Sequence, residues 1–269
     1  MTILQSVILG TVQGLTEFLP VSSTAHLRII PDLLGWPDPG ASFSATIQLG
    51  TLVAVFVYFT PEIKRLTIGA ISGLRARNLR YSQDSLLAWS IVLGTFPISV
   101  LGLVFREFVE TTARSITIVA FALIGLSIML LLAEKIGARN RSIDSLRFWH
   151  IQFIGLCQAL ALIPGSSRSG STIMAGLIVG LKHQEAARFS FLLGLPAIAA
   201  SGLLQLLKLI QEDTGNLLGL TIGIITASIS GYLSIEFLLR FIERHGTYVF
   251  AYYRIVLGIA LLAGIYLNH

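Results

Sequence analysis

The chain has 269 residues, of which 54% are hydrophobic and only 12% are charged, with a formal net charge of +5. A soluble domain usually carries about 25% charged residues, so this composition excludes an ordinary water-soluble globular protein. The positive charge does not indicate a nucleic-acid-binding protein, because the basic residues lie between apolar segments, where they act as topology signals. The single cysteine, Cys157, excludes an internal disulfide and a cysteine-based metal site.

Apolar segments long enough to cross a bilayer recur along the chain. A spanning helix needs roughly 20 mostly apolar residues. The sequence therefore predicts an all-α polytopic membrane protein, with residues 1–269 forming one membrane domain. The six predicted spans cover residues 42–59, 86–105, 116–133, 189–210, 217–239 and 248–267.

Two further apolar regions, 3–34 and 149–181, are interrupted near their middles by Pro20 and by Pro164-Gly165. Proline removes a backbone donor and clashes with the preceding helical turn, so each region is predicted to form two short helices around a bend. Non-helical backbone at membrane depth is tolerated only where protein or a wet cavity surrounds it.

The basic residues predict the topology. They are concentrated in the long loop predicted at 60–85, in 134–148 together with Lys182, and between the last two spans. Positive-inside asymmetry places these segments in the cytoplasm. The alternation of sides is satisfied only if 3–34 and 149–181 are re-entrant helical hairpins that enter from opposite faces. The first would enter from outside, where both termini would also lie.

The two interrupted regions resemble each other in sequence. Residues 13–24 read QGLTEFLPVSST and residues 158–168 read QALALIPGSSR, so Pro20, Ser22 and Ser23 match a proline and two serines at an offset of 144. We therefore predict an inverted-topology repeat with halves of about 1–145 and 146–269, an architecture typical of transporters. The competing interpretation is a chance match between similar apolar helices.

The first interrupted region carries candidate acid–base and nucleophilic groups. Gln13 and Glu17 are four residues apart, so they share one helix face, and an ionisable residue within an apolar segment is a functional candidate. Ser22 and Ser23 follow the proline at a helix start, where free N–H groups suit a phosphate. His26 lies within helical reach of either hydroxyl. The competing interpretations are a water-exposed, idle carboxylate and a structural histidine.

The second interrupted region carries a candidate anion clamp. Arg168 lies among hydroxyl and glycine residues between apolar segments, and its planar guanidinium fits phosphate oxygens. The competing interpretation is an internal salt bridge between Arg168 and Glu17, which is compatible with anion binding. One hairpin would supply the acid–base or nucleophilic group and the other the clamp, giving one composite site. The hydroxyl residues assigned to the clamp are Ser166, Ser167, Ser169 and Thr172.

The segments QGLTEFLPVSSTAH and PGSSRSGST resemble the two signature motifs of the bacitracin-resistance type of undecaprenyl-diphosphate phosphatase, and the resemblance covers the whole chain. Many members carry Glu at the position of Gln13, so any carboxylate duty would fall on Glu17. The resemblance implies removal of the terminal phosphate of undecaprenyl diphosphate, which recycles the lipid carrier of cell-wall synthesis and confers bacitracin resistance. It also implies a site at the outer face of the bacterial cytoplasmic membrane, helped by Mg²⁺ or Ca²⁺.

When the family's catalytic residues are carried over to the matching positions, the resemblance implies that Glu17, Ser23, His26 and Arg168 are catalytic. It also makes Glu17 a candidate metal ligand. In the mechanistic hypothesis, Ser23 attacks the terminal phosphorus with help from His26, and Glu17 orients His26 or holds the divalent ion. His26 as the nucleophile remains the close alternative.

A competing function is that of a transporter or flippase for a prenyl-lipid phosphate, which the inverted repeat suggests. The lipid phosphatase type with a PSGH-like motif is disfavoured, because that motif is absent from the sequence. The expected partners are a polyprenyl diphosphate lipid and the bilayer, without nucleic acid. Assembly into a homodimer is compatible with the sequence.

Overall fold

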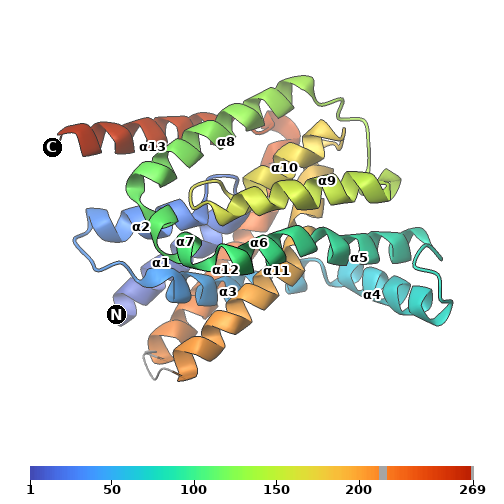
Figure 1. Ribbon diagram of the computed structural model, residues 1–269, viewed down its shortest axis with the longest axis horizontal. Coiled ribbons are helices and arrows are strands. Elements are labelled where there is room, and N and C mark those ends of the chain that lie inside the picture. The colour runs from blue at the N-terminus through green and yellow to red at the C-terminus, as the bar shows by residue number, and fades with distance from the viewer. Residues whose placement is uncertain (212–216, 268–269) are drawn as a thin grey trace.

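The computed structural model describes residues 1–211 and 217–267 of a helical protein (Figure 1). Six of its helical segments are long and apolar enough to cross a bilayer, and they correspond to the six predicted spans. The expectation of an all-α polytopic membrane protein is therefore confirmed. The spans are α3 (Gly40–Tyr58), α5 with α6 (Gln83–Gly94 and Phe96–Val104), α8 (Ile116–Ile136), α11 (His183–Gln211), α12 (Leu217–His245) and α13 (Tyr248–Leu267).

Both interrupted regions are broken where the prolines predicted. The first consists of α1 (Ile3–Phe18) and α2 (Ser23–Leu33), and the second of α9 (Phe148–Gln158), the 3₁₀ turn η3 (Ala159–Leu162) and α10 (Arg168–Ile178). Four further elements complete the described chain. They are α4 (Thr60–Arg75), α7 (Arg106–Glu110), η1 (Thr112–Arg114) and η2 (Ile143–Ser145).

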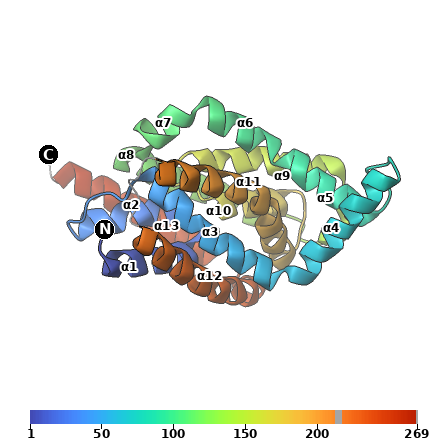
Figure 2. The ribbon, with the colours of Figure 1, turned by 90° about the horizontal axis from the view of Figure 1, so that it is seen from below.

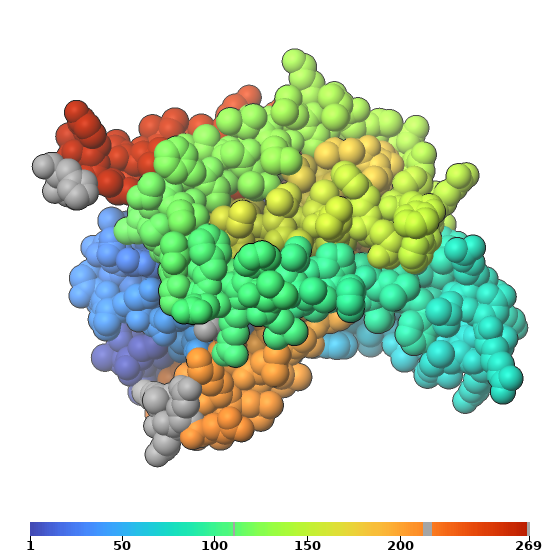
Figure 3. Space-filling view, viewed as in Figure 1, coloured from blue at the N-terminus to red at the C-terminus, as the bar shows by residue number. Residues whose placement is uncertain are grey.

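The prediction of a long loop over residues 60–85 is wrong, because most of this segment forms the helix α4. Pro61 stands in the first turn, where its missing N–H costs nothing and its fixed φ favours a helix start. Leu66, Gly69 and Gly73 are buried on α4, and the two glycines lie against the start of α5. Figures 2 and 3 show the α4–α5 pair projecting at one end of the molecule, while both termini lie at the other end.

Glycines allow α1 to lie directly against α12. A Cβ atom at Gly10 would overlap Thr226, and a Cβ atom at Gly14 would overlap Ser230. The hydroxyl of Ser234 on α12 also donates to the carbonyl of Leu15 at 2.9 Å. Small residues of this kind let helix backbones approach closely in a membrane, where packing drives association. The contact fixes the axis of α1 and so the position of Glu17 near its C-terminal end.

We expect Gly14→Ala to lower the stability of the protein by about 1–3 kcal/mol, the usual cost of overpacking a tight contact. The added methyl would meet the carbonyl of Ala227 at 2.5 Å, and this backbone atom cannot rotate away. The measurement is the thermal unfolding midpoint in detergent. Gly264→Ala on α13 is the matched control, because nothing lies within 4 Å of its added Cβ. Equal midpoints for the two variants would contradict the prediction.

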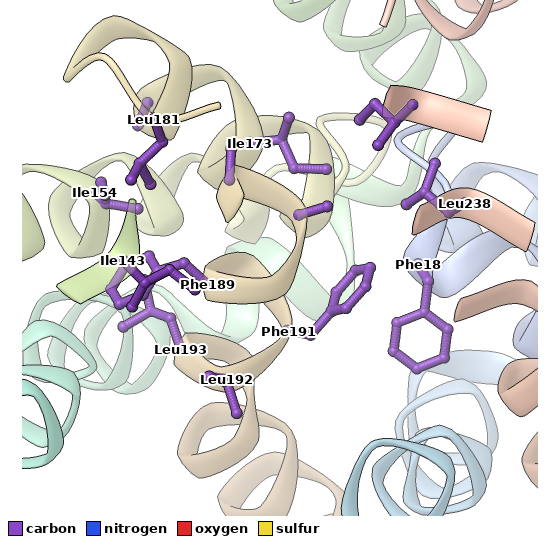
Figure 4. Close-up of a cluster of buried hydrophobic side chains, with 14 of the residues drawn as sticks. Phe18, Ile143, Ile154, Ile173, Leu181, Phe189, Phe191, Leu192, Leu193 and Leu238 are labelled. Atoms are coloured by element: carbon purple, nitrogen blue, oxygen red, sulfur yellow. The ribbon is translucent and has the colours of Figure 1, made fainter. Parts of the chain in front are cut away.

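A cluster of buried apolar side chains holds the end of α1 against α11. Phe18 is fully buried, and its ring meets the Phe191 ring edge-on, with centroids 5.0 Å apart (Figure 4). Leu238 from α12 belongs to the same cluster, which extends through Ile173 of α10. Because Phe18 directly follows Glu17 and Ile173 is five residues beyond Arg168 on the same helix, this packing fixes the relative position of the two charged residues.

Candidate active site

Two serines with left-handed backbone conformations form the bends of the interrupted regions. Ser22 has φ 74° and caps α2, where its hydroxyl accepts the N–H of Ala25 at 3.4 Å. Ser167 has φ 66° and caps α10, where its hydroxyl accepts the N–H of Gly170 at 3.0 Å. Positive φ is costly for a residue with a side chain and clusters at functional sites. The two helix starts are therefore built in the same strained way.

The structural match between the bends differs by one residue from the sequence match. The offset of 144 pairs Ser23 with Ser167, but the capping serines are Ser22 and Ser167, which are 145 residues apart. The second bend holds one more residue between its proline and its cap. In consequence Ser23 and Arg168 occupy equivalent positions, because each is the first residue of its helix.

The two bends contact each other through backbone and hydroxyl groups. The N–H of Gly165 donates to Thr24 Oγ1 at 3.3 Å, and Ser169 Oγ donates to the carbonyl of Leu19 at 3.1 Å. Residues about 145 apart in the sequence are thus joined directly. The two interrupted regions therefore meet at their bends, as the sequence predicts.

Glu17 is the centre of this site. Its Oε2 accepts hydrogen bonds from Gln13 Nε2 at 2.8 Å and from Ser23 Oγ at 2.7 Å. Its Oε1 accepts from Arg168 Nε at 3.3 Å and Nη2 at 3.2 Å. The residue is 5% exposed, so it does not lie idle at a water-filled mouth. The helix-starting residues of both bends therefore bind one carboxylate.

Arg168 is held on a second side by α11. Its Nη1 donates to the carbonyl of Ser190 at 3.0 Å and lies where a side chain at Gly194 would stand. Thr172 Oγ1 lies 2.5 Å from Ser190 Oγ and donates to the carbonyl of Arg168 at 2.9 Å. Arg168 also forms an ion pair with Glu17, with Nη2 and Oε1 3.2 Å apart. The competing interpretation of Arg168, a salt bridge between the two regions, is therefore confirmed. The planar guanidinium is fixed before any substrate binds.

His26 lies at the edge of the site in a defined tautomer. Its Nδ1 is 2.7 Å from the carbonyl of Ser22, which can only accept, so Nδ1 carries the proton. In the neutral ring, Nε2 then accepts the hydrogen bond from Tyr253 Oη at 2.6 Å, and the two rings stack. The hypothesis that Glu17 orients His26 is wrong in this structure, because the oxygens of Glu17 and the nitrogens of His26 bind other groups.

Burial lowers the pKa of His26, although the hydrogen bond to the Ser22 carbonyl opposes the shift. We therefore expect His26 to be neutral at pH 7 and to titrate below its ordinary value of about 6.5. If neutral His26 takes part in turnover, phosphate release will fall only as the pH drops through this lowered pKa. The measurements are ¹⁵N NMR of the imidazole and the pH–rate profile, with His26→Gln as the comparison. Titration above the ordinary value would contradict the prediction.

The remaining predicted residues also lie at the bends, and the structure adds residues that the sequence did not reveal. Ser166 is fully buried and its hydroxyl has no hydrogen-bond partner within the described part of the chain. Ser190 and Tyr253 were missed, because single polar residues on apolar helices are common, whereas Thr24 belongs to the quoted hydroxyl cluster but was not assigned to the site. Arg254 was also missed, although a lone arginine inside a predicted span is a recognisable signal.

Within the residues that the structure describes, the protein alone does not offer a built site for a divalent ion. Among the residues that the structure describes, no three His, Cys, Asp or Glu side chains gather in one place. Glu17 is the carboxylate of the site, and both of its oxygens already accept hydrogen bonds. Mg²⁺ is often bound by one or two carboxylates together with substrate phosphates. The donor set therefore fits an ion that is held mainly by the substrate.

The chain matches known proteins over nearly its whole length. The family model described as bacitracin resistance protein BacA matches residues 6–260. A protein of Chloroherpeton thalassium named undecaprenyl-diphosphatase is 51% identical, and the match covers 98% of this chain and 96% of that protein. An undecaprenyl-diphosphatase of Chlorobaculum tepidum is 48% identical, and the match covers 100% of this chain and 99% of that protein.

Proposed function

Because the chain belongs to the bacitracin resistance protein BacA family, we propose that it hydrolyses undecaprenyl diphosphate to undecaprenyl phosphate and inorganic phosphate. The observation that carries this proposal is the position of Glu17 between the hydroxyl of Ser23 and the guanidinium of Arg168. A nucleophile, a base and an anion-binding group thus meet at one carboxylate. The reaction returns the lipid carrier to cell-wall synthesis, and bacitracin resistance is expected of cells that carry the protein.

We assign the first proton transfer to Glu17. Ser23 Oγ forms a bond to the terminal phosphorus, and its proton passes to Glu17 Oε2, which lies 2.7 Å away. The bond from the terminal phosphorus to the bridging oxygen breaks, and undecaprenyl phosphate leaves with that oxygen. Water then attacks the phosphorus of the phosphoserine, the Ser23 Oγ–P bond breaks and Glu17 returns its proton to Ser23 Oγ, which releases inorganic phosphate and restores both residues. This assignment replaces the expected role of His26 as the base for Ser23.

Anion binding falls to Arg168 and to the two helix starts. A guanidinium matches phosphate oxygens in pairs, and the free N–H groups at the starts of α2 and α10 favour negative charge. His26 lies one turn along α2 from Ser23, and its Nε2 lone pair accepts the hydrogen bond from Tyr253, so it would activate the water of the second step only after Tyr253 releases Nε2. Mg²⁺ or Ca²⁺, expected from the family resemblance, would reach the site with the diphosphate.

We also propose that the site faces the outer side of the cytoplasmic membrane. Six candidate spans make the chain a multi-pass membrane protein. Both termini lie at the end opposite the basic α4–α5 pair, which supports an outside position for the termini (Figures 1 and 2). The first interrupted region would then enter from outside and the second from the cytoplasm, as an inverted repeat requires. Accessibility labelling of single cysteines in Cys157→Ser protein, at Thr2 and at Arg77, tests this orientation.

Purified protein in detergent tests the activity and separates it from lipid transport. We expect release of inorganic phosphate from undecaprenyl diphosphate, a reaction that a transporter alone does not perform. Rapid quenching with a substrate labelled in the terminal phosphate should trap the label on Ser23. Label on His26 would favour a phosphohistidine and overturn the serine mechanism. Absence of phosphate release from folded protein would overturn the proposed function.

A further inference from the structure

Arg254 is a charged side chain buried inside a membrane span. It lies on α13, has 0% exposure and is the largest fully buried side chain in the described residues. Within the described ranges no carboxylate forms an ion pair with it, and its Nε and Nη1 have no hydrogen-bond partner. An ionisable group in this setting is costly, so its presence requires a functional explanation.

The guanidinium of Arg254 holds the bend of the second interrupted region. Its Nη2 donates to the carbonyl of Gly165 at 3.1 Å and to that of Ser166 at 3.0 Å. Its Nη1 occupies space left by Gly170, where an added Cβ would stand 2.8 Å away. In a planar trans peptide the N–H points opposite to the carbonyl. Holding the Ser166 carbonyl therefore turns the N–H of Ser167 away from Arg254.

The charges of the site add up to an excess of positive charge. Arg168 is paired with Glu17, so that pair is close to neutral. Arg254 has no such partner and lies beneath the positive end of the α10 helix dipole. The hydroxyls of Ser166 and Ser171 are also buried without partners in the part of the chain that the structure describes. A buried cation without a compensating carboxylate is an arrangement that an anion would complete.

We propose that Arg254 is a positioning residue for the anionic end of the substrate. It fixes the second bend so that its N–H groups face the site, and it supplies the positive charge that the Glu17–Arg168 pair does not. This inference rests on the proposed function, because the anion it serves is the diphosphate. Arg254 contacts backbone carbonyls of the bend, so it acts through the bend and through its charge.

The test uses inorganic pyrophosphate as the probe and full-length protein in detergent. We expect Arg254→Gln to weaken pyrophosphate binding by about tenfold or more, the usual scale for losing a charged hydrogen-bonding group. Binding is read from thermal stabilisation by pyrophosphate, and the KM for the lipid should rise more than kcat falls. Arg254→Lys keeps the charge but not the paired carbonyl contacts. Its affinity for pyrophosphate should therefore lie between those of the wild-type protein and Arg254→Gln. Arg114→Gln, which removes a surface partner of Asp38, is the control.

A second variant guards against loss of folding in Arg254→Gln. Gly170→Ala should push the guanidinium aside while keeping its charge, and should also weaken pyrophosphate binding. Unchanged pyrophosphate affinity in either folded variant would overturn the role of Arg254. A wild-type protein that releases no phosphate would overturn the proposed function alone, because the binding measurement requires no catalysis.

Discussion

Replacing Glu17 with glutamine is expected to lower kcat/KM for undecaprenyl diphosphate by roughly 10²- to 10⁴-fold, the range usual for losing a general base. Glutamine has nearly the same shape and keeps one carbonyl oxygen for Arg168, but it cannot take the proton of Ser23. The effect should fall mainly on kcat, since the guanidinium remains in place to bind phosphate. Steady-state phosphate release across a range of lipid concentrations measures both parameters.

A matched control separates this chemical role from a general effect of removing a carboxylate. Glu243 is exposed near the end of α12, and Glu243→Gln should leave kcat/KM unchanged. Burst experiments add a second criterion, because Glu17→Gln should form the phosphoserine slowly from the first turnover. A Glu17→Gln protein with wild-type kcat would rule out Glu17 as the base for Ser23.

Replacing Arg168 with lysine should be nearly as damaging, with kcat/KM falling on the order of 10²- to 10³-fold. The guanidinium holds Glu17 through Nε and Nη2 and the Ser190 carbonyl through Nη1 at the same time. A lysine ammonium is a single point of charge and cannot hold both groups in one plane. We expect KM and kcat both to change, because the same atoms position Glu17 and bind the phosphate.

Gly194→Ala tests the position of the guanidinium without changing any charge. Its added methyl would overlap the Nη1 and Cζ atoms of Arg168, so the side chain must move. Activity should fall although Glu17, Ser23 and Arg168 are all present. Gly125→Ala on α8 is the control, since nothing lies within 4 Å of that added Cβ. Wild-type activity in Gly194→Ala would show that the exact placement of the guanidinium is unimportant.

The sequence alone was sufficient for the spans and for the two charged residues that the bends bring together. Runs of apolar residues and two prolines determine where helices form and break in a bilayer, so the spans and both bends followed directly. Glu17 and Arg168 were found because charge is rare in such segments. Their ion pair was one of two interpretations of Arg168, and the structure shows that it exists.

Details that depend on three-dimensional contacts could not be predicted. The sequence aligns Ser22-Ser23 with Ser166-Ser167 and does not show which serine of each pair caps its helix. The positive φ of Ser22 and Ser167 identifies the caps and so reveals the one-residue difference between the bends. His26 was expected within reach of the Ser22 or Ser23 hydroxyl, but its Nδ1 binds the backbone carbonyl of Ser22, and its Nε2 binds Tyr253, which is 227 residues away. Helix α4 was taken for a loop because its charged residues, among them Lys64, Arg65 and Arg75, make it too polar to be a membrane span.

The ion pair between Glu17 and Arg168 also bears on which ligand the site keeps. Arg168 is already bound to a carboxylate of the protein itself, so an incoming phosphate must compete with Glu17 for the guanidinium. That competition favours the ligand with more negative charge, and a diphosphate carries more than the monophosphate left after hydrolysis. Glu17 is thus an internal competitor for Arg168, and the diphosphate displaces it more readily than the monophosphate does. This difference favours release of undecaprenyl phosphate once the reaction is complete.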